Sequence, residues 1–194
     1  SKPKPISLYS KLCFKYENYL KNKKKIKFTI LRLGTLYGWS NRMRYDLAIN
    51  KIIRDIIFLK KVEILGGEQQ RFFCFNEFAC YAIYTMIKDK NEKFLNKTIN
   101  LGIFNSNIIK LTQKIVSLIK RDNVLISHEK HNIDKRSYKV ALNSSKKIAH
   151  KKFNFNKYLR YSIIKTFNKI KNDKMPFDIK KVTLNVYKNY LMKK

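Results

Sequence analysis

Short apolar runs alternate with longer amphipathic segments along this chain of 194 residues. The short runs are rich in β-branched and aromatic side chains, which is the pattern of buried strands. They predict extended segments at residues 26–33, 62–65, 71–75, 97–102, 123–127 and 137–142.

Helices are predicted where apolar residues recur every three or four positions. In residues 7–20, the side chains of Leu12, Tyr16, Tyr19 and Leu20 fall on one helical face. The same periodicity predicts further helices at residues 46–59, 76–87 and 107–120 and through most of the chain beyond residue 142, with Asn76 and Asn107 placed to cap two of them.

Strands that alternate with helices in this way indicate an α/β fold with parallel strand pairing. Gly34 and Gly38 bracket a predicted loop, and the Gly66-Gly67 pair marks a turn. No internal repeat or low-complexity linker divides the sequence.

The formal net charge of +31 is large for a chain of this length. Such a charge attracts nucleic acids and anionic membranes non-specifically. A dedicated nucleic-acid surface concentrates its basic residues, with arginine prominent, whereas the lysines here are spread along the whole chain. Isoleucine and asparagine are also heavily used, as in proteins from AT-biased genomes. Most of the charge is therefore interpreted as a solvated surface, with a functional basic patch as the alternative.

Features that report on cellular location favour the cytoplasm. No apolar run is long enough to cross a membrane, and the N-terminal residues have no apolar segment of the kind found in secretory signals. Cys13, Cys74 and Cys80 are scattered thiols without the spacing of a zinc site, which favours a reducing compartment and predicts no metal centre.

Six segments of the chain are similar to the motifs of a known protein family. They are "PISLYSKLCFKYE" (5–17), "RLGTLYG" (32–38), "NRMRYDLAIN" (41–50), "GGEQQRFFCFNEFA" (66–79), "KTINLG" (97–102) and "DKRSYKV" (134–140). In order and spacing they resemble the C-terminal part of NAD-dependent epimerases/dehydratases, the extended short-chain dehydrogenases that modify nucleotide sugars.

The resemblance implies the C-terminal part of a Rossmann-like doubly wound fold together with a small substrate-binding α/β subdomain. Residues 1–60 would form the end of the NAD-binding domain, and residues 61–194 mainly the substrate-binding subdomain, with the chain crossing back to the sheet. The glycine-rich βα unit that holds the cofactor pyrophosphate in this family has no counterpart in these residues. We therefore expect a piece of a longer protein, or a truncated relic.

In this family a tyrosine moves a proton on or off a sugar hydroxyl while hydride passes to or from NAD or NADP. Tyr9 matches that tyrosine. The lysine that lowers its pKa lies four residues further on, one helical turn away, and this position holds Cys13. Lys11 and Lys15 do not replace it, because they point elsewhere on the helix. Without the resemblance, Tyr9 would be a surface aromatic and Cys13 a buried, inert thiol.

The resemblance assigns the other candidate site residues. Tyr9, Gly34, Thr35 and Tyr37 would contact the cofactor, although a core aromatic explains Tyr37 equally well. Arg71 and Arg136 would grip the substrate pyrophosphate, since the planar guanidinium matches paired phosphate oxygens. Asn50 would hydrogen-bond the nucleotide, with an ordinary helix residue as the alternative. Arg44 would support the substrate pocket.

Three functions remain open from the sequence. The first is an NAD(P)-dependent nucleotide-sugar epimerase or dehydratase, whose activity the Cys13 position makes doubtful and whose cofactor this chain alone would not bind tightly. The second is a non-catalytic or relic protein of the same fold. The third is a basic protein associated with nucleic acid. The expected partners are a nucleotide sugar and a second copy of the chain, which would dimerise through the helix of Tyr9.

Overall fold

The computed structural model describes residues 3–23, 25–90, 92–121, 123–129, 137–149 and 154–182. In chain order the elements are α1 (Leu8–Lys21), β1 (Thr29–Leu33), β2 (Thr35–Tyr37), α2 (Ala48–Phe58), β3 (Lys61–Leu65), β4 (Gln70–Phe75), α3 (Asn76–Lys88), β5 (Lys97–Leu101), β6 (Phe104–Asn107), α4 (Ile108–Ile119), β7 (Leu125–Glu129), α5 (Asn143–Ile148), α6 (Phe155–Ile170) and α7 (Ile179–Val182).

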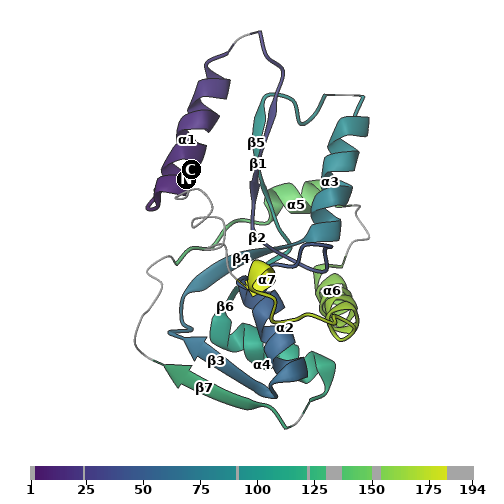
Figure 1. Ribbon diagram of the computed structural model, residues 1–194. Coiled ribbons are helices and arrows are strands. Elements are labelled where there is room, and N and C mark those ends of the chain that lie inside the picture. Colours follow the sequence, from purple (N-terminus) through teal and green to yellow (C-terminus); the bar gives the residue numbers. More distant parts are fainter. Residues whose placement is uncertain are drawn as a thin grey trace.

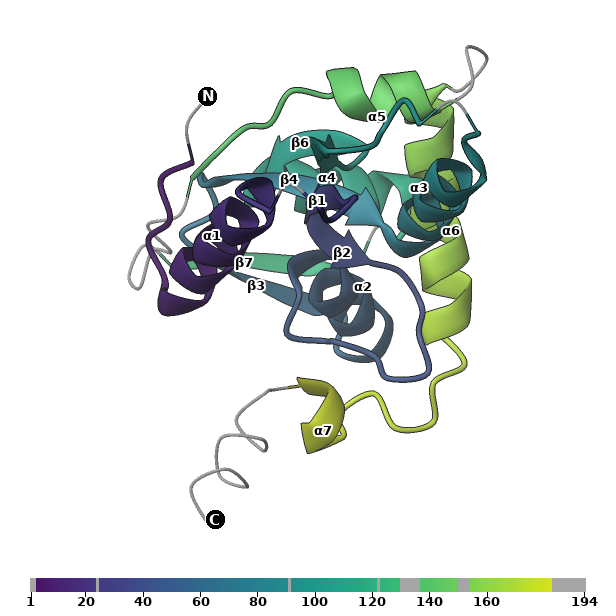
Figure 2. The ribbon, with the colours of Figure 1, turned by 90° about the horizontal axis from the view of Figure 1, so that it is seen from above.

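One end of the molecule is built on the parallel pair of β1 and β5, in which Thr29 aligns with Lys97 and Leu33 with Leu101. Helices α1 and α3 lie on opposite sides of this pair, as both views of the ribbon show (Figures 1 and 2). Helix α5 packs against β5, where the Ser145 hydroxyl accepts a hydrogen bond of 3.0 Å from the Gly102 N–H. The predicted parallel pairing is confirmed here.

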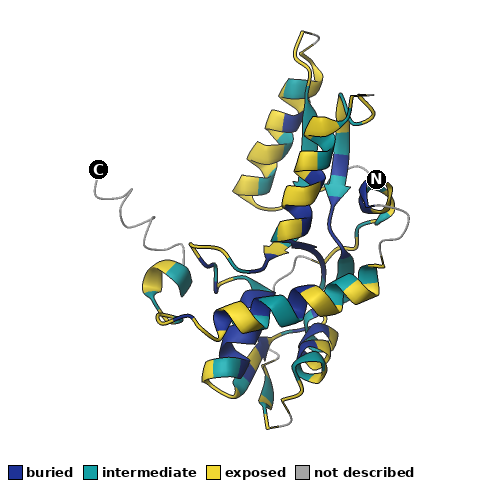
Figure 3. Cartoon of the chain, turned by 90° about the vertical axis from the view of Figure 1, so that its right-hand side faces the viewer, coloured by how far each residue is buried: buried dark blue, intermediate teal, exposed yellow. Residues whose placement is uncertain are grey.

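The other end is organised around β4. This strand pairs in parallel with β2 and antiparallel with β6, while β3 and β7 form a separate parallel pair. Helices α2, α4 and α6 pack on one another beside these strands. Figure 3 shows the buried residues gathered where strands and helices cross, with exposed residues on the outer faces of the helices. The largest buried side chains include Phe72, Phe73, Phe75, Phe78 and Ile53.

The N-terminal helix is attached in a way that its apolar pattern does not predict. Leu12, Tyr16 and Tyr19 are exposed, and Glu17 is the residue of α1 that is buried. The Glu17 carboxylate accepts hydrogen bonds from Arg32 Nε (2.9 Å) and Nη2 (2.6 Å), and it also pairs with Lys21. An ion pair therefore joins α1 to β1.

Four of the described helices have an asparagine at their start, and in two of them its side chain caps the helix. The side chains of Asn107 and Asn154 accept hydrogen bonds from the backbone N–H three residues on, as N-cap residues do. The predicted cap at Asn76 is wrong, because Asn76 is already the first residue of α3. Its side-chain amide instead donates to the Trp39 carbonyl at 2.6 Å.

Two strands lie where no strand was predicted. The predicted loop between Gly34 and Gly38 contains β2, and β6 precedes α4. Both are too short to show a pattern of their own, and they form because β4 supplies a partner on each side. The extended segment predicted at residues 137–142 has no strand partner, but the Tyr138 N–H donates to the Gln70 carbonyl at 3.1 Å.

The predicted division at residue 60 stays a prediction. The chain passes between the two ends of the molecule repeatedly, because α3 and β5 follow β3 and β4 in the sequence but lie at the end that contains β1 (Figure 1). Among the described helices, none combines the length and the apolar character that a membrane crossing needs.

We predict that Glu17→Gln lowers the free energy of unfolding by about 1.5–3 kcal/mol, the range for hydrogen bonds to charged groups. Burial opposes the charged form of Glu17, but the hydrogen bonds from Arg32 and Lys21 outweigh it and hold its pKa below the ordinary value of 4.5. This contribution is therefore present above pH 4.5 and is lost as the pH falls through the lowered pKa.

Urea unfolding of both proteins at pH 7 and at successively lower pH measures the difference. Glu63→Gln, which removes an exposed pair with Lys61, is the matched control and should leave the unfolding free energy nearly unchanged. Equal effects of the two substitutions would contradict the prediction.

Candidate functional site

The strongest candidate site is a cavity of about 480 Å³ between the strands around β4 and the start of α2. Its wall includes Thr35 from β2, Lys51 from α2, Arg71 from β4 and Tyr138 from the segment beside β4. Asp46, Leu47 and Ala48 close it on the side of the loop that precedes α2. Elements far apart in the sequence thus contribute polar groups to one concave surface.

Arg71 is buried at this wall. Its Nη1 donates to the Gln70 carbonyl at 3.1 Å, and its guanidinium lies 5.7 Å from the centre of the Tyr138 ring. A guanidinium held against an aromatic ring keeps a fixed orientation, and its planar fork is the group that best matches phosphate or carboxylate oxygens.

The acidic groups of the cavity are paired with cations. Asp46 accepts from Arg44 Nε at 2.7 Å and Nη2 at 2.6 Å, and Glu63 forms an ion pair of 2.7 Å with Lys61. The hydrogen bond from Lys61 lowers the pKa of Glu63. The wall also includes the basic residues Lys51 and Arg71, a composition that suits an anionic ligand.

A more open hollow of about 490 Å³ lies along the outward face of α6, lined by Tyr161, Lys165 and Lys169 among others. Among the described residues, its walls come from α6 and from Asn172 just beyond it, and they include none of the candidate site residues from the sequence. The cavity at Arg71 is more enclosed and draws on several elements, as ligand sites do.

Asn50 is placed differently from the expectation that it binds a nucleotide. It is buried, its side-chain oxygen accepts from the Gly38 N–H at 3.1 Å, and its amide donates to the Arg44 carbonyl at 3.1 Å. It is not among the residues that line the cavity. The loop of residues 38–47 is hereafter the pocket loop. Asn50 thus ties this loop to α2 at Gly38 and at Arg44, whose guanidinium binds Asp46.

Two of the predicted cofactor residues are enclosed by packing. Tyr37 is 2% exposed, and its hydroxyl lies 2.6 Å from that of Ser162. Tyr37 is therefore a core aromatic residue, the second of the two interpretations that the sequence allowed. A Cβ on Gly34 would stand 3.0 Å from backbone atoms of Phe72 and Phe73, so β4 fills the space beside it. Thr35 and Tyr9 are the two that a ligand can reach.

Tyr9 and Cys13 lie together on the outer surface of α1. Tyr9 is 78% exposed, and Cys13 is exposed as well, so the expectation of a buried thiol is wrong. The hydrogen bond between the two side chains raises the pKa of Tyr9, and the nearby thiol raises it further. This is the opposite of what a lysine at this position does. Tyr9 does not line the cavity at Arg71, and Arg136 lies outside the described residues.

Comparison with protein families decides the relationship. The NAD dependent epimerase/dehydratase family matches residues 1–102, which is more than half of the sequence. The chain belongs to this family. No curated protein sequence matches it significantly.

Solved structures of the family share its fold. The epimerase/dehydratase chain superposes on UDP-N-acetylglucosamine 4-epimerase of Methanobrevibacter ruminantium, in complex with UDP-N-acetylmuramic acid, with a TM-score of 0.66 and 23% identity over 85% of this chain and 54% of that one. For dTDP-glucose 4,6-dehydratase of Bacillus anthracis with NAD the TM-score is 0.67, with 17% identity over 90% and 57%. For RMD of Pseudomonas aeruginosa with NADPH it is 0.68, with 11% identity over 88% and 58%.

These matches confirm the mixed α/β, Rossmann-like fold. They also show that the chain spans between 54% and 58% of the length of these three relatives. The activities of the whole relatives therefore do not transfer to this chain by similarity alone.

We predict that replacing Cys13 changes the pKa of Tyr9 in two steps. Cys13→Ala removes the contacts that raise it and brings the pKa back toward 10, whereas Cys13→Lys lowers it further because a cation one turn away stabilises the phenolate. Titration of ¹³Cζ-labelled tyrosine by NMR, with Tyr9→Phe to assign the signal, measures this. Identical titrations for all three proteins would show that position 13 does not act on Tyr9.

We also predict that Asn50→Ala destabilises the protein by about 1–3 kcal/mol, because it leaves a buried N–H and a carbonyl without their partner. Asn41→Ala, at an exposed position of the same loop, is the control. Thermal and urea unfolding compare the two variants, and an Asn50→Ala protein as stable as Asn41→Ala would contradict the role as a tie.

Proposed function

We propose that this chain provides the substrate-binding part of a nucleotide-sugar epimerase or dehydratase and that the cavity at Arg71 holds the nucleotide-sugar phosphates. The observation that supports this most directly is the cavity itself, where a buried arginine, a lysine and a tyrosine ring converge. Family membership and the sugar nucleotide bound to a structural relative point to the same ligand class.

In this proposal, Arg71 pairs with the pyrophosphate oxygens and Arg136 adds a second contact. Tyr138 stands beside Arg71 and offers an aromatic face. Arg44 shapes the cavity through Asp46 and the pocket loop, and Asn50 acts by holding that loop instead of touching the ligand.

The proposal assigns catalysis to Tyr9. Tyr9 would move a proton at a sugar hydroxyl, and its pKa is raised where the reaction needs it lowered. Family membership implies NAD or NADP as the redox partner. Of the predicted cofactor residues in this chain, Tyr9 and Thr35 are the ones placed to contact it. We infer that this protein retains nucleotide-sugar binding better than it retains catalytic turnover. The non-catalytic alternative therefore stays open.

The apolar side chains exposed on α1 are the basis for a proposed homodimer in the cytoplasm. Leu8 is 74% exposed and Leu12 is 53% exposed, and they lie next to Tyr9 and Tyr16 on the outer face. Large apolar groups grouped on one helix typically mark an interface.

We predict that UDP-glucose or dTDP-glucose binds to the full chain and that Arg71→Ala weakens this binding about 10- to 100-fold, as expected for loss of about 1.5–3 kcal/mol at a charged hydrogen bond. Arg71→Lys should recover only part of the loss, because an ammonium cannot pair with two oxygens in one plane.

Isothermal titration calorimetry at fixed ionic strength measures both affinities, with Arg160→Ala on the exposed face of α6 as the control. Equal weakening by Arg71→Ala and Arg160→Ala, together with a steep loss of binding at higher salt, would instead favour non-specific polyanion binding. No binding of either sugar nucleotide to the unaltered chain would overturn the proposal.

A further inference from the structure

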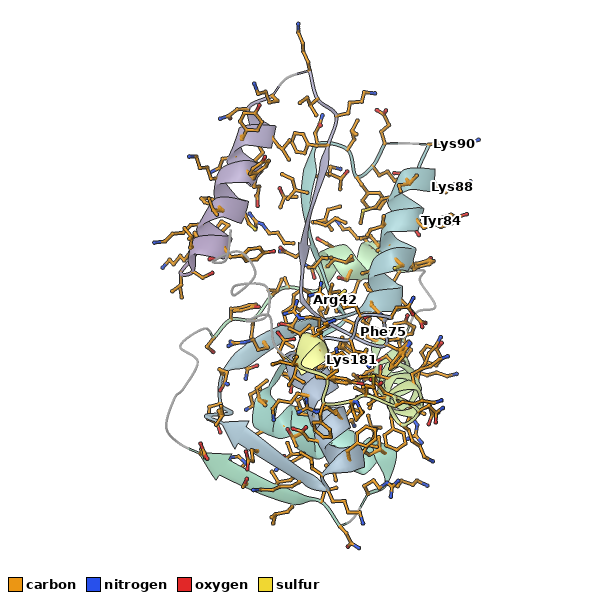
Figure 4. All side chains as sticks on the ribbon, in the orientation of Figure 1. Arg42, Phe75, Tyr84, Lys88, Lys90 and Lys181 are labelled. Atoms are coloured by element: carbon orange, nitrogen blue, oxygen red, sulfur yellow. The ribbon has the colours of Figure 1, made fainter. Side chains whose placement is uncertain are left out.

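The segment that follows α6 returns to the pocket loop. Residues 171–182, hereafter the strap, leave the end of α6 and run past α2 to α7 (Figures 1 and 2). Figure 4 labels Lys181 in α7 and Arg42 in the pocket loop, in the middle of the molecule where the two segments meet. The Tyr45 N–H donates to the Lys181 carbonyl at 2.7 Å, which fixes one contact between them.

Asp173 is the buried polar centre of the strap. Its Oδ1 accepts from Lys181 Nζ at 2.7 Å and from the Met175 N–H at 3.0 Å, and its Oδ2 accepts from the Tyr45 hydroxyl at 2.6 Å. Burial opposes its charge, but these three hydrogen bonds outweigh the burial and hold the pKa of Asp173 below 3.8. The carboxylate therefore stays ionised and accepts from all three donors at ordinary pH.

Tyr45 carries this contact to the cavity. It is 0% exposed, and burial and the bond to Asp173 raise the pKa of its hydroxyl, so the hydroxyl remains a donor. The three residues that follow it, Asp46, Leu47 and Ala48, form part of the cavity wall. Where Tyr45 is held, this part of the wall is held as well.

The strap is also seated against α2. The Phe177 ring lies 4.9 Å from the Arg54 guanidinium and 6.2 Å from the Phe58 ring, while Arg54 lies 5.4 Å from the Tyr45 ring. Asn50 ties the pocket loop to α2 from within, and the strap fastens it from outside. The loop is thus held at two independent places.

We propose that Asp173 is a positioning residue for the nucleotide-sugar cavity, which it shapes from outside by fixing Tyr45 and hence the pocket loop. The effect on ligand affinity rests on the proposed function of that cavity. The effect on the loop does not, because it concerns the protein without ligand.

The loop contains its own reporter. Trp39 is the single tryptophan of the chain, and it lies half-buried in the pocket loop with its carbonyl bound to Asn76. Its fluorescence in the folded, ligand-free protein reports on loop position, which a simple loss of global stability does not change at temperatures well below unfolding.

The test compares the full chain with Tyr45→Phe, Asp173→Asn and the double variant. Tyr45→Phe removes only the hydroxyl and keeps the ring, so it remains informative if Asp173→Asn fails to fold. Lys180→Ala, at an exposed residue of the strap whose backbone N–H, not its side chain, bonds to Asp178, is the control. Trp39 emission, thermal unfolding and UDP-glucose affinity are measured on each.

Both single variants should shift Trp39 emission to the red and weaken UDP-glucose binding about tenfold, the change that corresponds to one hydrogen bond. The double variant should be no worse than the stronger single one, because both substitutions break the same contact. Unchanged emission in folded Tyr45→Phe and Asp173→Asn would overturn the positioning role. Shifted emission together with no UDP-glucose binding by the unaltered chain would instead reject the proposed function and leave the loop contact standing.

Discussion

The close passage of β4 beneath the ends of β1 and β5 constrains the rest of the structure. Gly34 ends β1 with its backbone against Phe72 and Phe73, and a Cβ on Gly102, after β5, would stand 2.4 Å from the Phe72 ring. The Ile103 N–H then donates to the Phe73 carbonyl at 2.7 Å. Because the two glycines have no side chains, β4 can pass this close to the ends of β1 and β5. It thereby joins the two ends of the molecule and presents Arg71 to the cavity.

Much of the secondary structure follows from local pattern. Helices α2 and α4 and strands β3 to β5 lie close to where periodicity and asparagine placement predict them. What the sequence could not supply is pairing between distant segments, since β2 and β6 exist only beside β4. Asn76 shows the same limit, because its side chain leaves the expected cap to bind Trp39, which lies 37 residues earlier.

The candidate site divides in the same manner. The sequence identifies Arg71 and Thr35 from their motifs, and both line the cavity. It does not identify Lys51, Tyr45 or Asp173. Lys51 is one lysine among many, and neither Tyr45 nor Asp173 in the strap has a local sequence signal that predicts their hydrogen bond. Glu17 is the last residue of the first segment that resembles the family, yet its ion pair with Arg32 depends on a strand that only the folded chain brings beside it.

The bond between Tyr45 and Asp173 spans 128 residues of sequence, the longest separation among the side-chain hydrogen bonds described. On the ribosome, the loop before α2 is made long before its partner is, so the early-forming α/β core must persist with this loop unfastened. The pocket loop therefore reaches its final position only after α6 and the strap have been made, late in the synthesis of the described residues.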